Sequence, residues 1–179
     1  YYGQDVLWAR SLLEWTPGAD DVVRNTVYHY DALRDYRNVE SYRLSAGNDA
    51  VVRSGALLQR HDQQVYGNRL EWAHDGVIGR LPSQWNLGVD ISYNRQTRFP
   101  LSLPGTIDTV ALDAVTPGHF LDVPGATIAY VPDRTNRLHT QAVFVENLTR
   151  LTPALSLLTG LRHDRIRLDV VNHRGASAS

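Results

Sequence analysis

The stretch Trp85-Asn86-Leu87-Gly88-Val89-Asp90-Ile91-Ser92-Tyr93-Asn94-Arg95 decides the fold of this chain. Its odd positions from Trp85 to Tyr93 are all apolar or aromatic, and its even positions are all small or polar. Successive side chains of a β-strand point to opposite faces, so the stretch predicts a strand with one apolar and one polar face. The apolar face has an aromatic residue at each end. A strand that crosses a membrane has this form, with about 9–11 tilted residues and aromatic rows that bracket its lipid face.

The composition narrows the classes of protein. The chain has 179 residues, enough for one sizeable domain. Its 18 basic residues are all arginine and face 19 acidic ones, and a net charge of -1 gives no reason to expect a nucleic-acid partner. Cysteine is absent, which excludes disulfides and cysteine-based metal sites. There is no apolar run of membrane-helix length, no signal peptide and no methionine even at position 1, so we expect a piece of a longer protein.

Strand-type sequence recurs along the chain. The expected strands are 6–16, 22–36, 51–78, 85–99, 137–148 and 155–170. Residues that favour turns predict short connections at 17–21, 79–84 and 149–153. Gly55 and Gly67 fall inside the third strand, where we expect them to mark bulges or bends.

Two longer connections separate these hairpins. One is the polar cluster 34–48, and the other is 100–134, which holds five of the eight prolines. Because proline cannot donate to a sheet ladder, we expect 100–134 to be a long loop, and loops of that length are usually functional. Short and long connections alternate strictly, as in outer-membrane barrels with tight periplasmic turns and long extracellular loops. The predicted fold is all-β, an antiparallel up-and-down meander of about six long strands that forms a slice of a transmembrane β-barrel.

Three tryptophans support this arrangement. Trp15, Trp72 and Trp85 lie on the strand ends nearest the short turns, where the lower aromatic row of a barrel is expected.

Several segments resemble the paired barrel strands of TonB-dependent siderophore receptors. They are 66–72 with 87–90, 142–147 with 157–164, and the segment 25–36. In the motif Gly160-Leu161-Arg162-His163-Asp164, His163 stands where the family usually has tyrosine. The resemblance covers nearly the whole chain and implies that residues 1–179 are part of a 22-stranded barrel, without the plug domain and the TonB box of that family.

The resemblance also implies a function. It predicts part of an outer-membrane receptor that binds a ferric siderophore and imports it with TonB-derived energy. The iron arrives inside the chelate, so no cofactor, no protein ligand to a metal and no enzymatic activity are expected. The implied partners are the ferric siderophore, outer-membrane lipid and lipopolysaccharide, the plug domain of the parent chain, and TonB through that chain. The implied location is the bacterial outer membrane.

Aromatic residues and arginines near the long connections are the candidates for ligand binding. They are Tyr28, Tyr30, Tyr36, Arg37, Arg98, Phe99, Phe120 and Tyr130, with His119 and Arg134 beside them. The parity of the strand 22–36 stays open. If Tyr28 and Tyr30 face inward they could stack on an iron chelate, and if they face outward they belong to an aromatic row.

Other polar residues receive simpler interpretations. Asp90 and Arg162 fall on faces expected to line the lumen against the plug. Arg95 shares the apolar face, so it can extend to the outer interface, where lipopolysaccharide phosphate is one possible contact. Three His-Asp dipeptides begin at His61, His74 and His163, but neighbours in a strand face opposite sides, so no pair can converge on one metal.

The sequence is also compatible with three other functions. The first is a receptor for haem, cobalamin or another metal chelate. The second is a soluble all-β module that binds carbohydrate, and the third is an autotransporter or another barrel without a transport role. The sequence has no nucleophile elbow and no His-Glu-x-x-His motif that would favour a hydrolase.

Overall fold

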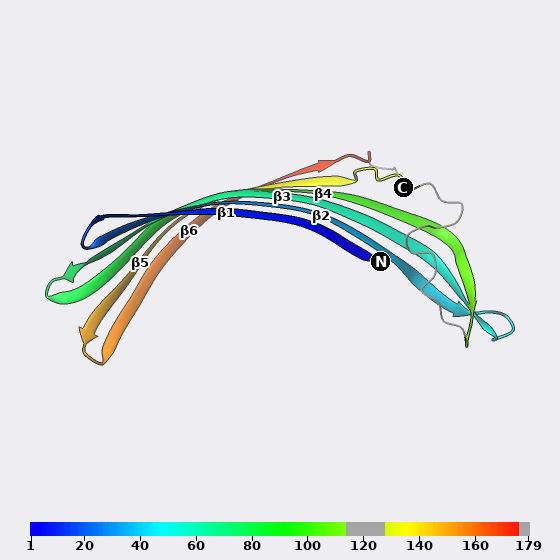
Figure 1. Cartoon of the computed structure of the whole chain (residues 1–179), viewed down its shortest axis with the longest axis horizontal. Helices are drawn as coiled ribbons and strands as arrows, with labels where there is room; N and C mark the ends of the chain where they lie inside the picture. Colours follow the sequence, from blue (N-terminus) through cyan, green and yellow to red (C-terminus); the bar gives the residue numbers. More distant parts are fainter. Residues whose placement is uncertain (114–127, 176–179) are drawn as a thin grey trace.

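The computed structural model describes residues 1–113 and 128–175. They form one antiparallel sheet of six strands, in which each strand pairs with the next one in sequence (Figure 1). The strands are β1 (Tyr2–Gly18), β2 (Asp21–Leu44), β3 (Ala50–Ile78), β4 (Leu81–Ala111), β5 (Arg134–Thr152) and β6 (Leu155–Asn172). The predicted all-β meander is confirmed.

The described residues contain no helix with the length and apolar character needed to span a membrane.

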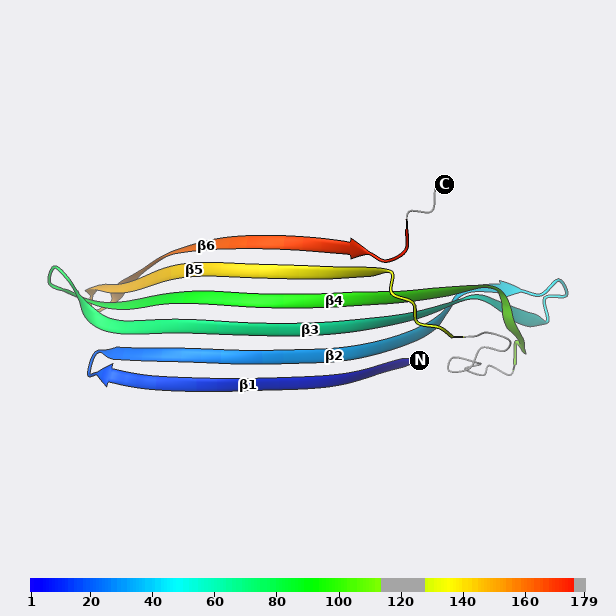
Figure 2. The same ribbon diagram turned by 90° about the horizontal axis from the view of Figure 1, so that it is seen from above.

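The sheet is a single curved layer (Figures 1 and 2). The turns at 19–20, 79–80 and 153–154 lie together at one end. The first two lie inside the predicted connections 17–21 and 79–84, and the third overlaps the predicted connection 149–153 at its last residue. At the other end, β2, β3 and β4 run on past β1, β5 and β6 (Figure 2). We call this end the outer end.

The two predicted loops are partly wrong. β2 continues to Leu44 and joins β3 through the turn 45–49, so 34–48 is mostly strand. β4 continues to Ala111, so 100–134 begins as strand. The physical reason is long-range pairing: each extension has β3 beside it, and the backbone hydrogen bonds override a polar or proline-rich composition.

Proline is tolerated in β4 because of where its nitrogen points. Pairing of β4 with β5 ends at Arg98, whose carbonyl oxygen accepts a hydrogen bond from the Asp133 nitrogen on that side. Pro100 is two residues further on, so its nitrogen points to the same side, where β5 has already ended. Pro104 lies where the register between β3 and β4 shifts. Neither proline interrupts a regular ladder.

The two glycines of β3 have different roles. Gly55 has a φ of 67° at a register shift, which confirms the predicted bulge. Gly67 pairs regularly with Tyr28 and Ser92, so the bulge predicted there is wrong. The ring of Tyr28 occupies the space that a Cβ at position 67 would fill, and Phe144 does the same over Gly88. These glycines give room to aromatic rings from the neighbouring strand.

The register divides the sheet into two faces. We call the face that carries Trp85 and Tyr93 the banded face, because its exposed apolar side chains form a band between two aromatic rows. The outer row consists of His29, Tyr66, Tyr93 and His139, in which His29 stacks on Tyr66 at 4.4 Å and Tyr93 contacts His139 at 4.8 Å. The inner row, near the short turns, consists of Trp15, Trp72 and Trp85. The sequence predicted this inner row correctly.

The opposite side is the polar face, the side of Asp90 and Phe144. Near the short turns it carries a network of ion pairs: Arg24 with Glu14 at 2.7 Å, Arg69 with Glu71 at 2.9 Å, and Arg162 with Asp164 at 2.7 Å. Phe144 is only 9% exposed and lies between two of these arginines, 5.0 Å from Arg69 and 6.0 Å from Arg162. Its ring joins three strands through cation–π contacts.

The outer extension of β2, β3 and β4 has a small core of its own. Ala56 and Leu58 are buried there, and partly buried aliphatic residues pack on them: Leu101, Leu103, Ile107 and Ile128. Arg53 is 5% exposed and pairs with Asp108 through two hydrogen bonds. This extension therefore has its own small apolar cluster and a largely buried ion pair.

We predict that Gly88→Ala destabilises the sheet by about 1–3 kcal/mol, because the added methyl displaces the Phe144 ring. The measurement is the free energy of unfolding from denaturant titration in detergent micelles. In a Phe144→Ala background the same change should cost much less, which gives a coupling energy from the double-mutant cycle. Gly175→Ala is the control, because nothing lies within 4 Å of its Cβ position. Equal costs in both backgrounds would contradict the prediction.

Candidate functional site

The candidates from the sequence divide between the two faces. Four of them lie on the polar face in strands β2 and β4: Tyr28, Tyr30, Tyr36 and Arg98. Arg37 and Phe99 lie on the banded face, where Tyr130 packs near Arg37. Phe120, and His119 beside it, lie outside the described residues. The structure thus divides the seven candidates that it describes between two separate groups, one on each face.

Tyr28 and Tyr30 point to the polar face, which answers the question of parity. Trp8 of β1 lies against both rings, with ring centroids 6.0 Å from Tyr28 and 5.9 Å from Tyr30. Trp8 is not among the ligand candidates predicted from the sequence. The register of this hairpin shifts by one residue between Trp15 and Gly18, and this shift places Trp8 opposite Tyr30. Counting back from the turn at 19–20 without the shift would place Trp8 opposite Asp31, so the sequence offers no simple signal for it.

Two rows further out, a line of basic side chains crosses the polar face. Arg34, His61 and Arg98 are direct neighbours in the register of β2, β3 and β4. A terminal nitrogen of Arg34 donates a hydrogen bond to Nδ1 of His61. Arg34 and His61 are missing from the candidates based on sequence, because only the register aligns them with Arg98.

The state of His61 follows from this hydrogen bond. Arginine has donors only, so Nδ1 must accept and the ring proton must sit on Nε2. Burial, and then the charges of Arg34 and Arg98, lower the pKa of His61 below its ordinary value. The ring is therefore neutral at pH 7 and presents an N–H donor. Neither Nε2 of His61 nor Nε of Arg98, both buried, has a hydrogen-bond partner among the described residues.

A hollow of about 110 Å³ opens beside this line on the polar face. It is lined by Gln4, Tyr30, Ala32, Arg34, His61, Gln63 and Gln96. All of these belong to strands β1 to β4, and none is acidic. The hollow has the size of a small chemical group and not of a whole chelate, so it can hold one polar group of a larger ligand.

The second group of candidates forms a clamp on the banded face. Arg60 donates two hydrogen bonds of 2.7 Å to Asp35, and the ring of Tyr130 covers its guanidinium at 3.9 Å. A terminal nitrogen of Arg37 donates to the Tyr130 hydroxyl at 3.4 Å. The hydrogen bonds from Arg60 lower the pKa of Asp35. These side chains contact one another, and their arrangement ties Tyr130 to β2 and β3.

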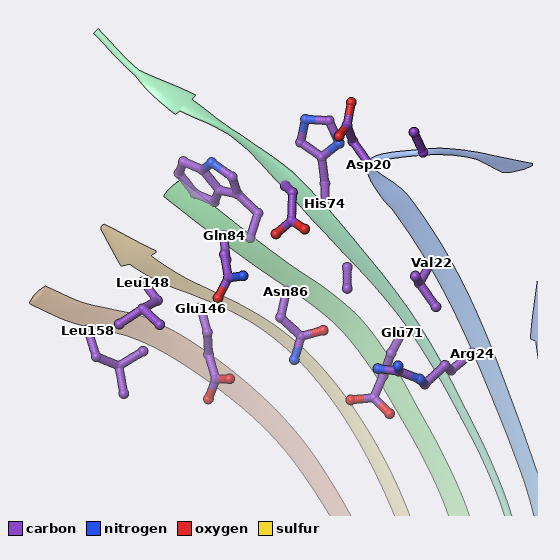
Figure 3. Close-up of a pocket in the computed structure, with 14 residues that line it drawn as sticks. Asp20, Val22, Arg24, Glu71, His74, Gln84, Asn86, Glu146, Leu148 and Leu158 are labelled. Atoms are coloured by element: carbon purple, nitrogen blue, oxygen red, sulfur yellow. The ribbon is translucent and has the colours of Figure 1, made fainter. Parts of the chain in front are cut away.

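A larger hollow of about 420 Å³ lies near the short turns (Figure 3). Most of its lining comes from the polar face of β2 to β6: Val22, Arg24, Glu71, Ala73, Asp75, Gln84, Asn86, Glu146, Leu148 and Leu158. Acidic groups outnumber arginine there. This hollow is larger than the one beside Arg34 and His61. Its lining is mainly acidic, whereas the line of Arg34, His61 and Arg98 is basic.

The His-Asp dipeptides do not form metal sites. In each pair the two side chains lie on opposite faces, as the alternation of a strand requires. The described residues contain no group of three or more His, Asp or Glu side chains placed to hold a metal ion.

We predict that Asp35→Asn costs about 1–3 kcal/mol of stability at pH 7, because it leaves Arg60 without its charged partner. Because the pKa of Asp35 is lowered in the folded state, this stabilisation is present above the ordinary pKa of aspartate. It is lost as the pH falls through the pKa that Asp35 has in the folded protein. The difference between wild type and variant, measured by denaturant titration, should therefore shrink toward pH 3. Asp169→Asn, in an exposed pair, is the control and should cost below about 1 kcal/mol. A cost for Asp35→Asn that does not change with pH would contradict this assignment.

Comparison with known proteins now adds to the geometry. The chain matches the family described as TonB dependent receptor-like, beta-barrel, over residues 2–179. Its fold is similar to the crystal structure of BauA, the ferric preacinetobactin receptor from Acinetobacter baumannii, with a TM-score of 0.70 and 10% sequence identity. The match covers 94% of this chain and 25% of BauA. None of the curated protein sequences matches the chain.

These findings have different weight. At 10% identity, the likeness to BauA shows a shared fold, and this chain spans a quarter of the length of that receptor. The family match rests on sequence and extends over almost every residue. The chain belongs to the β-barrel family of TonB-dependent receptors.

Proposed function

We propose that this chain is part of an outer-membrane receptor that binds a ferric siderophore and imports it with TonB-derived energy. The observation that carries the proposal is the polar face at the outer end, where aromatic rings of Trp8, Tyr28 and Tyr30 lie beside the line of Arg34, His61 and Arg98. Aromatic planes and cationic donors suit a large, polar, partly aromatic ligand. The similarity to a ferric preacinetobactin receptor supports it.

The two faces fit a barrel wall in the outer membrane. The eight steps from Trp85 to Tyr93 span about 26 Å along the strand, and a tilt of 35–45° reduces this to roughly 20 Å of height. An apolar band of about 25 Å is typical of such barrels. We propose that the banded face meets lipid and that the polar face lines the lumen. β1 and β6 would then pair with further strands of the parent chain, because an open sheet edge is not tolerated in lipid.

In this arrangement the ion-paired half of the polar face meets the plug domain of the parent chain. Its acidic groups outnumber its arginines, and it borders the larger hollow (Figure 3). Asp90 and Arg162 lie within it, on the face that the sequence assigned to the lumen. Rearrangement of the plug, driven through TonB, would open the path to the periplasm. No bond is made or broken, so the proposed role is transport and not catalysis.

Lipopolysaccharide is the proposed partner of the banded face. Arg95 and Arg137 lie directly opposite each other on β4 and β5, one row outside the aromatic pair of Tyr93 and His139. Both arginines are exposed. Like charges in facing positions repel each other, and a phosphate group shared between them would relieve the repulsion.

The assignment of the faces predicts opposite behaviour for adjacent residues. The chain has no cysteine, so Ile91→Cys and Ser92→Cys each add one thiol to this segment. A water-soluble maleimide should label Ser92→Cys through the lumen of the plug-free barrel and should leave Ile91→Cys, on the banded face, largely unlabelled in lipid. The measurement is labelling in intact proteoliposomes and again after the protein is unfolded. The reverse pattern would contradict the assignment.

Uptake measurements test the ligand class. A strain that lacks the parent gene should lose uptake of at least one ferric siderophore from a panel supplied under iron starvation, and the gene on a plasmid should restore it. Haem and cobalamin belong in the same panel. Unchanged uptake of every siderophore would refute the siderophore proposal. Extraction of the parent protein from cells without detergent would refute the membrane location.

A further inference from the structure

The charges of the polar face are not evenly distributed. Between the row of Arg10 and the row of Tyr36, the described residues of this face include four arginines and no Asp or Glu. The arginines are Arg10, Arg34, Arg98 and Arg134. Closer to the short turns, the register places six acidic residues on this face: Glu14, Glu71, Asp75, Asp90, Glu146 and Asp164.

Nearby acids do not neutralise this outer cluster. The carboxylates of Asp31 and Asp35 lie on the opposite face of the sheet, where they accept hydrogen bonds from Gln64 and Arg60. Asp133 follows the end of β4–β5 pairing, but its carboxylate lies 3.8 Å from Arg174. The side chain of Arg34 donates a hydrogen bond to a neutral ring, that of His61. Arg34 and Arg98 flank His61 in the register, and two cationic side chains placed in this way without acids repel each other and favour an anion between them.

The donors of this cluster are also incompletely used. His61 Nε2–H and Arg98 Nε–H are buried, and neither has an acceptor in the described part of the chain. A buried donor without a partner is unfavourable, and a ligand oxygen would satisfy it. The hollow that Arg34 and His61 line has room for such a group. Charge and unused hydrogen-bonding capacity therefore lead to the same conclusion from independent observations.

We propose that the transported chelate is anionic, with negatively charged oxygens at its periphery, and that Arg34, His61 and Arg98 bind those oxygens. This inference rests on the proposed function and specifies its substrate class. Tyr30 lines the same hollow as Arg34 and His61, and the ring of Trp8 meets the ring of Tyr30 edge to face. A neutral chelate would leave the arginines without counter-charge, and a cationic chelate would be repelled.

The test uses the full-length receptor, purified in detergent, and two probes that differ in charge. One is a trianionic ferric tris-catecholate and the other is a neutral ferric tris-hydroxamate. Binding is followed by quenching of tryptophan fluorescence. Wild type should bind the anionic probe more tightly. Arg34→Gln and Arg98→Gln should each weaken that binding by roughly ten-fold or more, the loss expected when a charged hydrogen-bond donor is removed. Binding of the neutral probe should stay within about two-fold.

Arg165→Gln is the matched control. It removes the same charge from an exposed position on the opposite face of the sheet, in β6. If it weakens the anionic probe as much as Arg34→Gln does, the effect comes from net charge and the proposal fails. Preference of wild type for the neutral probe would also overturn it, while siderophore transport itself would stand.

A second measurement needs no variant. Raising the salt concentration from 0.05 to 0.5 M should weaken binding of the anionic probe by wild type and leave the neutral probe unchanged, because salt screens the attraction. Equal salt dependence for both probes would contradict the proposal even if the variants fail to fold. If wild type binds neither ferric probe but retains salt-sensitive binding of the iron-free catecholate, anion recognition stands and the proposed function fails.

Discussion

The hydrogen-bonded register of the sheet is the constraint on which the rest of this structure depends. Each strand pairs only with its neighbours in sequence, and the pairing is regular between the two aromatic rows. A shift of one residue in any strand would exchange its two faces. It would move Trp72 away from the side of Trp85 and Arg34 away from the side of Arg98. The separation of an apolar surface from a charged one is therefore set by backbone pairing, and the side chains follow.

Much of the fold could be predicted from the sequence for this reason. Alternation in 85–95 identifies a strand and its two faces, and Pro, Gly and Asp mark the short turns. The ends of β2 and β4 could not be found in the same way. Residues 34–44 and 100–111 look polar or proline-rich, but they are strands because β3 lies beside them. Pairing between distant segments supplies this stability, and local composition does not report it.

The candidate site was less predictable than the fold. The aromatic part is partly predictable, because Tyr28 and Tyr30 stand out in the sequence. The face to which they point is set by the β2–β3 register, in which Tyr28 pairs with Gly67 and Tyr30 pairs with Val65. The basic part was mostly missed. Arg98 was a candidate, but Arg34 and His61 are separated from it by tens of residues along the chain, and only the register of three strands makes them neighbours. A residue that acts as one member of an aligned row has no local signature.

One consequence of Pro100 concerns the shape of the rim. Beside this residue the ladder toward β5 cannot continue, since there is no N–H to donate, and a side-chain nitrogen of Arg174 caps the Pro100 carbonyl oxygen at 2.7 Å. In the described chain the wall is thus tall over β2 to β4 and low over β5 and β6 (Figure 2). The outer edge of the sheet therefore drops from β4 to β5, and Arg98 and Arg134 form the last residue pair before this drop. Pro100 thus marks the step where the wall falls from the height of β4 to that of β5, at the place where the basic row begins.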